Sequence, residues 1–511
     1  MKYIVKTFFV IISLLTLHSC FVAKDYERPE EEINPINYRT DQLPKDSIPV
    51  SKVSWKQMFT DSILQNHINE ALENNQDIRI ALQQINIANS YYKQGKAGYY
   101  PTVNINGSYT YQELAPNSQF GSFFSSIDQY EMNTSLSWEA DIWGKIRSNK
   151  RAAQARYMQT EAAHKAVKTD LISRIASGYY QILALDEQVT ITEQTLESRK
   201  KSLETSVALK DAGNLTSVAV NQTEAQVYAA EALLLDLKNN IKLLENTLSI
   251  LKGQSPQDFE RSKFSSQQIN QELTTGVASD LLENRPDVIA AEYQLINAFE
   301  LTNVAKSRFY PSITISATGG LQSLEPSDFI SANSLFLTLI GGLTQPIFNR
   351  RQIRTEYEVA LSEKEQALLN FERTLLIASR EVSDAMLNYQ NAGQRIDIKT
   401  KEYGAYQNAL EDSKELLNNG LANYLEVLNA QENALNTELE VSRTRLDKFN
   451  AIVELYRSYG VGERLERKSR NFLLYCCLSS NSKRINSTKN DPYGNTYHRR
   501  YRFNLKGLFC Y

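Results

Sequence analysis

The chain of 511 residues has few of the residues that build covalent or metal-based sites. It contains four cysteines and four histidines, and they are spaced neither as metal ligands nor as a disulfide framework. It also lacks a glycine-rich phosphate loop and a nucleophile motif. We therefore predict that the protein is not an enzyme and that it carries no cofactor and no metal.

Excess charge of one sign and long apolar runs are also missing. The 56 Lys and Arg nearly balance the 59 Asp and Glu, so the net charge of −3 gives no reason to expect nucleic acid as a partner. No apolar stretch after the N-terminus reaches the roughly 18–20 residues of a transmembrane helix. Hydrophobic residues at 42 % nevertheless exclude a chain that is disordered throughout.

Residues 1–19 resemble an export signal, because a short basic region precedes an apolar run that is too short to span a bilayer. The run ends in Leu17-His18-Ser19-Cys20, which resembles a bacterial lipobox. We expect acylation of Cys20, attachment of the chain to membrane lipid, and a proline-rich tether over residues 20–54. The alternative is an ordinary signal peptide in which Cys20 is incidental.

Proline is scarce, with 12 residues, and its placement indicates an internal tandem duplication. Tyr100-Pro101 recurs as Tyr310-Pro311, 210 positions later, and farther along the chain the offset becomes 207. We assign residues 55–262 to the first repeat and residues 263–462 to the second. Each repeat is expected to contain a helix, two strands and a long helical hairpin.

The hairpins are predicted from two very long stretches without proline, residues 117–255 and 347–491. In both, apolar residues step by three and four in a heptad register, with Lys, Glu, Asn and Gln between them. A helix over residues 145–210 would be on the order of 100 Å long. Gly213 and Gly420 are predicted to end one helix and to let the chain reverse.

Ahead of each hairpin the period of the sequence changes to two. Apolar and small polar residues alternate in four segments of ~9–11 residues, which is typical of transmembrane β-barrel strands. The segments are residues 102–111, 130–139, 313–322 and 335–343. The alternative is a soluble sandwich with one wet face. Four strands cannot close a pore alone, so a barrel would require several chains.

Several short motifs occur along the chain. They are Asp25-Tyr26-Glu27-Arg28-Pro29, the segment from Trp55 to Asp77, Tyr99-Tyr100-Pro101, the segment from Trp138 to Lys145, Arg285-Pro286-Asp287-Val288, and Ala430-Gln431. With the lipobox and the duplication, they resemble the TolC-like outer membrane efflux protein family. The similarity is greatest to the lipoprotein subgroup that serves resistance–nodulation–division (RND) pumps. It covers roughly residues 20–460.

This resemblance implies an α+β membrane protein. It implies a homotrimer in which four strands per chain build a twelve-stranded outer membrane β-barrel, continued into the periplasm by a long α-helical barrel. It also implies passive export of drugs or other small molecules from an inner-membrane RND-type transporter, through a periplasmic adaptor, to the exterior. Two alternatives remain, a periplasmic adaptor, which has one hairpin, and a trimeric surface fibre, which needs no strands of barrel length.

The resemblance further implies site residues at the hairpin turns. Family members close the periplasmic end near these turns, with acidic side chains that face the axis. This singles out Glu426 and Asn429 as gate residues, and the turns at Gly213 and Gly420 as adaptor-docking surfaces. The alternative is that Glu426 is an ordinary exposed residue on a helix flank.

The tail departs from the family pattern. From residue 463 onward the chain holds 11 Lys and Arg against 3 Asp and Glu, together with three of the four cysteines. We predict that residues 463–511 form a disordered or aberrant extension. A basic arm that binds the adaptor or the membrane is the alternative.

Overall fold

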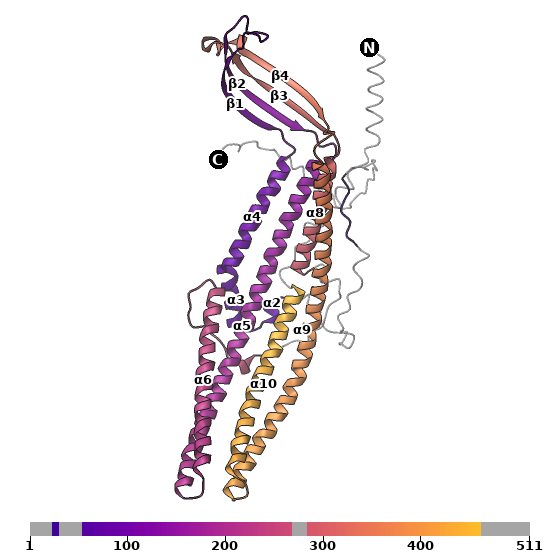
Figure 1. The fold of residues 1–511 in the computed structure, drawn as a ribbon. Helices are drawn as coiled ribbons and strands as arrows, with labels where there is room; N and C mark the ends of the chain where they lie inside the picture. Colours follow the sequence, from indigo (N-terminus) through magenta and orange to yellow (C-terminus); the bar gives the residue numbers. More distant parts are fainter. Residues whose placement is uncertain (1–22, 30–53, 268–283, 461–511) are drawn as a thin grey trace, which may run out of the picture. The chain divides into compact units, whose positions relative to one another are not determined.

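The computed structural model describes residues 23–29, 54–267 and 284–460. The predictions about the signal at residues 1–19, about Cys20 and about the tail from residue 463 fall outside the described residues. Within the described ranges the chain forms one four-stranded sheet and a set of helices that includes two very long hairpins (Figure 1).

The order of elements in the first half of the chain recurs in the second half. The first half consists of α2 (Trp55–Met58), α3 (Ser62–Asn74), α4 (Gln76–Ala97), β1 (Thr102–Glu113), β2 (Ser126–Glu139), α5 (Lys145–Asp211) and α6 (Ser217–Leu251). The second half consists of η2 (Phe264–Ser266), α8 (Pro286–Ser307), β3 (Ser312–Ser323), η3 (Pro326–Asp328), η4 (Ala332–Ser334), β4 (Leu335–Thr344), α9 (Gln352–Asn418) and α10 (Tyr424–Tyr459). The duplication is therefore visible in the fold, whereas the exact repeat boundaries stay a prediction.

Most of the helices begin at a residue suited to that position. The side chains of Asp61, Asn75, Thr216 and Asn423 accept hydrogen bonds from backbone N–H groups in the first turns of α3, α4, α6 and α10. Helix α8 instead begins with Pro286, whose missing N–H is no loss at that position. Local sequence therefore fixes where these helices start.

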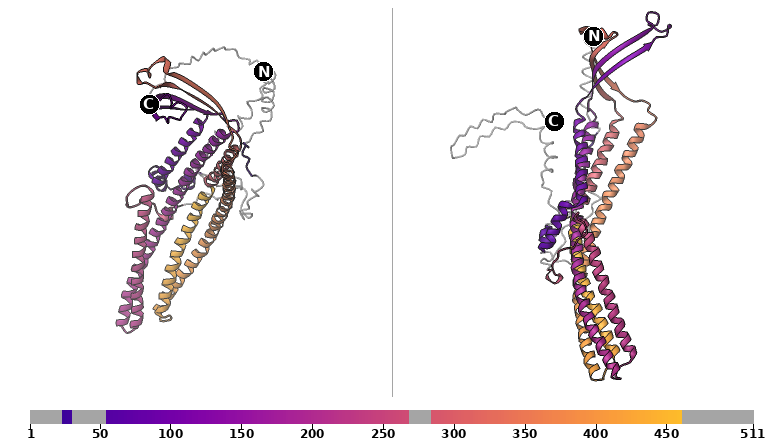
Figure 2. Two further views of the ribbon diagram at one scale, coloured as in Figure 1. Left: turned by 45° about the horizontal axis from the view of Figure 1, so that its top comes forward. Right: turned by 90° about the vertical axis from the view of Figure 1, so that its left-hand side faces the viewer.

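The two predicted hairpins are present. Helices α5 and α9 have 67 residues each, and the return helices α6 and α10 have 35 and 36. At a rise of about 1.5 Å per residue, each long helix extends about 100 Å. α5 lies beside α6, and α9 lies beside α10 (Figures 1 and 2). The predicted heptad seams are buried or half-buried, and Val227, Leu248, Phe371 and Val382 are at most 5 % exposed.

Two apolar clusters hold the helices together, and α10 contributes to both. The first includes Tyr179 of α5, Leu248 of α6 and Tyr456 of α10. The second includes Phe371 of α9 and Tyr459 of α10. The three tyrosines are fully buried. Helix α10 therefore joins the core of one hairpin to the core of the other.

Each half also contains a contact that we call a joint. In the first half the start of α4 contacts the end of α6, the return helix of the hairpin, and in the second half the start of α8 contacts the end of α10. In the first half, Asn75 caps α4 and donates a hydrogen bond from Nδ2 to the Leu251 carbonyl, at 2.9 Å. Gly253 follows α6 with a φ of +70°, and a Cβ there would lie 2.6 Å from the Asn74 carbonyl oxygen. Only glycine fits this close, left-handed position.

The second half repeats this joint with different chemistry. Arg285 donates from Nη1 to the Ser458 carbonyl, at 3.0 Å. Gly460 follows α10 with a φ of +63°, and a Cβ there would lie 2.5 Å from the proline that begins α8. The Arg285 side chain is 6 % exposed and also pairs with Asp287 and Glu381. The side chain that donates to the return helix is therefore a neutral amide in the first half and a guanidinium with its own ion pairs in the second.

The four strands lie in chain order in one antiparallel sheet. All four predicted strands are present, each slightly longer than expected. β1 and β4 form the two edges of the sheet. Among the helices of the described residues, none combines the length and the apolar character that crossing a bilayer requires.

Residues 23–29, within the predicted tether, lie against α8 and α5. The Lys24 backbone and the Asn303 amide exchange hydrogen bonds of 3.3 and 2.9 Å. Farther along, Arg28 pairs with Glu292 at 2.5 Å. These contacts hold the segment along α8.

Candidate channel site

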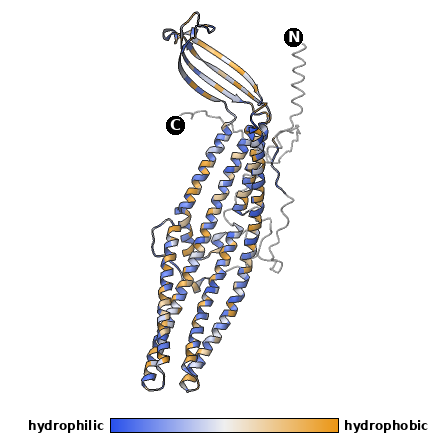
Figure 3. Ribbon diagram, in the orientation of Figure 1, coloured by the Kyte–Doolittle hydropathy of each residue, from blue (hydrophilic) through white to orange (hydrophobic). Residues whose placement is uncertain are grey.

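The strand register sorts the alternating residues of all four strands onto two faces. On one face Val103 pairs with Leu136, which pairs with Ala317, which pairs with Leu339. The neighbouring row on the other face consists of Asn104, Ser135, Thr318 and Thr338. The alternation is visible as bands of colour along the strands in Figure 3. One face of the sheet is therefore apolar and the other carries small polar groups.

The polar face has an exception in β4. Phe336 is opposite Gly320, and Ile340 is opposite Ser316, so both apolar side chains share the face of the polar rows. Elsewhere on this face amide and hydroxyl groups form hydrogen bonds, and the Glu131 carboxylate accepts from the amides of Gln129 and Asn133. Asn106 donates to Asn133 at 3.1 Å across the first strand pair.

Two tryptophans fix the points where strands meet helices. The Trp138 indole N–H donates to the Tyr99 carbonyl at 2.9 Å, and the Trp143 N–H donates to the Pro311 carbonyl at 2.7 Å. Trp143 also stacks on Tyr310, with ring centroids 4.9 Å apart. Tryptophan, with an apolar ring and one polar N–H, suits the boundary between a membrane and water.

The tips of the two hairpins have the same geometry. Gly213 and Gly420 have φ values of +77° and +71°. After Gly213, the Asn214 N–H donates to the Leu209 carbonyl at 2.8 Å, and the corresponding bond after Gly420 is 2.9 Å long. These are Schellman turns, which end a helix with a left-handed glycine. The prediction that these glycines reverse the chain is confirmed, whereas their role in docking stays a prediction.

Glu426 and Asn429 lie in the first two turns of α10, beside the second tip. The Glu426 backbone N–H donates to the Asn423 side-chain oxygen at 3.1 Å. Both predicted gate side chains are exposed, whereas Val427 and Leu428 between them are buried. Because residues three apart lie on one side of a helix, Glu426 and Asn429 share an exposed surface. The corresponding turn of α6 carries no acid.

A buried arginine forms one of the contacts that join the two hairpins toward their tips. The Arg199 side chain of α5 is 3 % exposed and donates to the Glu432 carboxylate of α10 at 2.6 Å. It also donates to the Gln226 carbonyl of α6 at 2.8 Å. Sequence reasoning did not identify Arg199, because its partner lies 233 positions away and no spacing rule links them.

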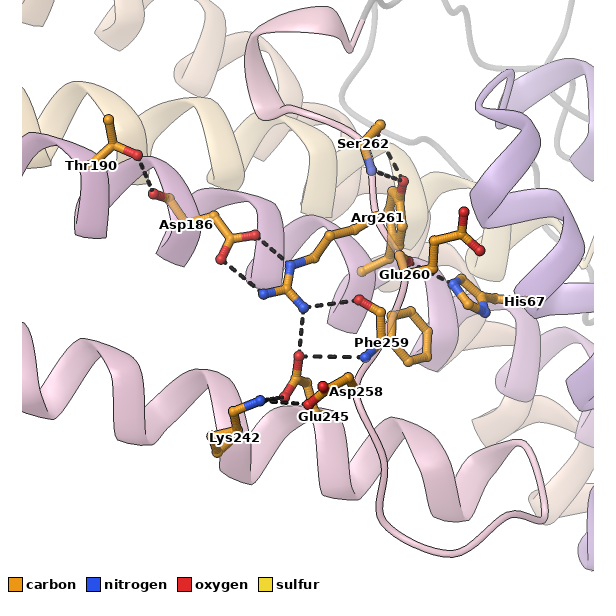
Figure 4. Close-up of polar contacts among 11 residues, drawn as sticks. His67, Asp186, Thr190, Lys242, Glu245, Asp258, Phe259, Glu260, Arg261 and Ser262 are labelled. Atoms are coloured by element: carbon orange, nitrogen blue, oxygen red, sulfur yellow. Dashed lines mark hydrogen bonds and ion pairs between the residues drawn. The ribbon is translucent and has the colours of Figure 1, made fainter.

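A second group of polar contacts fastens the segment after α6 to the hairpin (Figure 4). Arg261 lies between Asp186 of α5 and Glu245 of α6, and its Nη1 is 2.5 Å from the Glu245 carboxylate. Lys242 pairs with the same carboxylate at 2.9 Å. Burial alone would raise the pKa of Glu245, but hydrogen bonds from Lys242 and Arg261 outweigh it, so the pKa is lowered.

His67 of α3 extends this group toward the first joint. Its ring stacks on Phe259, with centroids 3.8 Å apart, and its Nε2 is 2.8 Å from the Glu260 carbonyl. Nε2 therefore carries the proton, and Nδ1 accepts from the Lys252 ammonium at 3.1 Å. Lys252 also pairs with Glu70 at 2.7 Å. Burial first, and then the nearby Lys252 charge, lower the pKa of His67.

Metal ligands are not assembled anywhere in the part of the chain that the structure describes. No group of three or more His, Cys, Asp or Glu side chains there could hold a metal ion. The charged groups near His67 and Arg261 pair with one another instead, which is typical of structural contacts between helices.

A sheet with one apolar face, attached to helices of about 100 Å, is the architecture of an outer membrane channel. A model of the family described as outer membrane efflux protein matches residues 67–254 and 277–461, which is more than half of the chain. The chain belongs to this family.

Two relatives are similar along nearly their whole length. The solvent efflux pump outer membrane protein SrpC of Pseudomonas putida is 27 % identical over 459 residues, covering 88 % of this chain and 97 % of that protein. The cation efflux system protein CusC of Escherichia coli (strain K12) is 25 % identical over 454 residues, with the same coverage of both. The protein is an outer membrane efflux channel.

The fold has a solved counterpart. The crystal structure of the Campylobacter jejuni CmeC outer membrane channel is similar with a TM-score of 0.77 at 22 % identity, covering 89 % of this chain and 98 % of that one. This likeness concerns the fold alone. It confirms the predicted combination of a strand domain with long channel helices.

Proposed function

We propose that three copies of this chain share one twelve-stranded barrel in the outer membrane and that their helices continue the channel into the periplasm. The sheet carries this proposal, because it has an apolar face, a polar face and two open edges, β1 and β4. In a bilayer every backbone N–H and C=O group must be paired, so a spanning sheet has to close on itself. Three chains supply an even number of strands within the range of known barrels.

Cross-linking tests the trimer. In a variant without the native cysteines, Asn106→Cys in β1 and Thr338→Cys in β4 should cross-link between chains and yield a species of three copies. The control is Asn106→Cys with Asn133→Cys, which are paired within one chain and should cross-link internally. A stable membrane-inserted monomer would contradict the proposal.

We also propose that Cys20 is acylated and tethers the chain to the inner leaflet of the outer membrane. Ala23 is buried beside Gly144, the residue directly before α5. Its Cβ lies 3.1 Å from the position that a Cβ on Gly144 would occupy. Cys20 precedes Ala23 by three residues, and three residues span at most about 10 Å. The acylation site therefore lies within about 10 Å of Ala23 at the strand-to-helix junction. Labelled fatty acid should enter the wild type and not the Cys20→Ala variant, and labelling that survives the substitution would refute the anchor.

The hairpin tips are proposed to dock a periplasmic adaptor, which links the channel to an inner-membrane RND-type transporter. Beside the turns at Gly213 and Gly420, the apolar side chains of Val218, Leu421 and Leu425 are 63, 75 and 49 % exposed. Val218→Asp with Leu421→Asp should abolish export of a dye such as ethidium from cells while trimer formation and conductance persist. Undiminished export would contradict docking at the tips.

The exported solutes are proposed to be small molecules chosen by the pump and not by the channel. The polar face of the sheet carries mostly small neutral groups, with Glu131 and Glu139 of β2 as carboxylates among them. Such a surface discriminates little among solutes. Names of relatives that refer to solvents and to cations support a broad cargo range. Exchange of the transporter should change the exported compounds, whereas exchange of the channel should not.

We further propose that Glu426 and Asn429 line the periplasmic gate. Three copies of Glu426 around a narrow axis would attract cations. Glu426→Gln should weaken cation preference and block by multivalent cations in single-channel recordings. The control is Asp211→Asn, an exposed acid at the tip of the other hairpin. Unchanged selectivity in Glu426→Gln, or an equal change in the control, would leave Glu426 without a gating role.

A further inference from the structure

Two junctions lead from the sheet into the long helices, one between β2 and α5 and the other between β4 and α9. They occupy the same place in the duplication, since Ile146-Arg147 aligns with Ile353-Arg354, 207 positions later. In each, the residue before the helix is left-handed, with a φ of +77° at Gly144 and +68° at Arg351. The side chains around this shared backbone differ in charge and in exposure.

The first junction is closed by contacts within the chain. Asp141 accepts hydrogen bonds of 2.8 and 2.9 Å from backbone N–H groups in the first turn of α5. Trp143 stacks on Tyr310, and Ala23 covers Gly144. Ile142 is still 53 % exposed, but the acidic and aromatic side chains of this junction are engaged within the chain.

The second junction is open and apolar at its start. Ile347 and Phe348 are 93 and 88 % exposed. They directly follow β4, whose Leu337, Leu339 and Leu343 are 79, 71 and 71 % exposed on the apolar face of the sheet. Apolar side chains are therefore exposed both on β4 and in the segment that follows it.

Beyond the apolar pair the junction becomes basic. Arg351 and Arg354 share one carboxylate, Glu358, at 2.9 and 3.1 Å, and their side chains are 64 and 70 % exposed. Arg350 forms no ion pair within residues 23–29, 54–267 and 284–460. Glu356, two positions after Arg354, pairs with Arg308, which directly follows α8. Arg351 and Arg354 thus share a single carboxylate, and with Arg350 the patch keeps a positive charge.

We propose that Ile347, Phe348, Arg350, Arg351 and Arg354 form a docking surface for anionic phospholipid of the inner leaflet. The guanidinium groups bind the headgroup phosphate, and the apolar pair enters the region between headgroups and acyl chains. This proposal rests on the proposed function, because it requires the sheet to lie in the outer membrane. A trimer would carry three such surfaces around the base of the barrel.

The arrangement favours a lipid over a free anion or another protein. A free phosphate would bind the arginines but would make no favourable contact with the two almost fully exposed apolar side chains beside them. Apolar side chains followed by basic ones match the order of layers at a membrane surface, in which acyl chains lie next to charged headgroups. Along the chain, the apolar residues of β4 and the pair Ile347 and Phe348 come first and the arginines follow, in the same order as acyl chains and headgroups.

The test uses the full-length trimer in nanodiscs that contain phosphatidylglycerol and phosphatidylcholine. The double variant Arg350→Asn with Arg351→Gly removes two charges and places there residues that tolerate a positive φ, so the fold is kept. The matched control is Arg380→Gln with Arg443→Gln, two exposed arginines of the second hairpin away from the junction. Native mass spectrometry then measures the phosphatidylglycerol retained per trimer.

The double variant should bind phosphatidylglycerol roughly thirtyfold more weakly, as expected for the loss of two arginines at a membrane surface, while the control matches the wild type. Unchanged retention, or equal loss in the control, would overturn the proposal. So would displacement of the lipid by millimolar inorganic phosphate, which would mark a free-anion site.

Conductance measurements test the channel function separately from lipid docking. A double variant that still conducts but has lost the lipid supports both the channel and the docking surface. If the wild type failed to insert, flotation with phosphatidylglycerol vesicles would still distinguish the double variant from the control.

Discussion

The joint at the base of the first hairpin and the joint at the base of the second solve one geometric problem with different chemistry. In both, a left-handed glycine ends the return helix and a backbone carbonyl in its last turn accepts a side-chain hydrogen bond. The donor is the neutral amide of Asn75 in the first joint and the guanidinium of Arg285 in the second. Duplication has kept the backbone and the acceptor while the donor changed.

The difference shows which part of the joint is tightly constrained. The glycines cannot vary, because their φ is positive and a Cβ would meet backbone or proline atoms. The donor can vary, provided that it reaches the carbonyl and its own charge is compensated. Arg285 satisfies this condition through Asp287 and Glu381, whereas Asn75 has no charge to compensate.

The largest expected effect is at the charged donor. Arg285→Met should lower the free energy of unfolding by about 3–5 kcal/mol, because it leaves the Ser458 carbonyl without this donor and leaves Glu381 with only the more distant Arg457, at 3.6 Å. A thermal melt of the helical circular dichroism signal in detergent measures this loss. Arg380→Met, an exposed arginine on the same helix as Glu381, is the control and should melt like the wild type.

The glycines should come next. Gly460→Ala and Gly253→Ala should each cost about 2–4 kcal/mol, from the left-handed backbone and from the close contact of the added Cβ. Gly213→Ala is the matched control, since its φ is also positive but its Cβ would meet nothing within 4 Å. If all three variants lost equal stability, the close contact at the joints would have no separate cost.

A smaller loss is expected at the neutral donor. Asn75→Ala should cost about 1–3 kcal/mol, since it removes the cap of α4 and leaves the buried Leu251 carbonyl unpaired. Asn86→Ala, on the exposed part of the same helix, is the control for helix propensity. A loss as large as that of Arg285→Met would remove the distinction between a neutral and a charged donor.

The sequence predicts the elements of this fold well, because each depends on local pattern. Heptad steps gave the hairpins, alternation gave the strands, and Gly213 and Gly420 marked the turns. The joints escaped prediction because Asn75 and Leu251 lie 176 positions apart. The hydrogen bonds of His67 escaped prediction for the same reason, because Glu260 and Lys252 lie 193 and 185 positions away. The structure of one chain shows that Glu426 is exposed. Whether its side chain faces the channel axis depends on how the three chains assemble.

The smallest expected effect concerns pH and again separates the two joints. His67 contacts Lys252, which directly follows α6 at the first joint, and the second joint has no histidine among its contacts in the described residues. The folded-state pKa of His67 lies below its ordinary value of 6.5, mainly because of burial. The unfolded chain therefore takes up the proton first as the pH falls, so the contribution of His67 to stability is present above about pH 6.5 and is lost below it.

Hydrogen exchange can detect this loss within a single sample. After correction for the intrinsic effect of pH, residues 253–267 should exchange faster as the pH falls from about 7.5 to about 5.5, across the ordinary histidine range. Residues 452–460, which hold the second joint, should not change. Protonated His67 would turn Nδ1 into a donor that faces the Lys252 ammonium, and this loosens the first joint without touching the second. His67→Gln, which cannot titrate, should remove the difference between the segments, and a difference that persisted in that variant would mean that another group senses the acid.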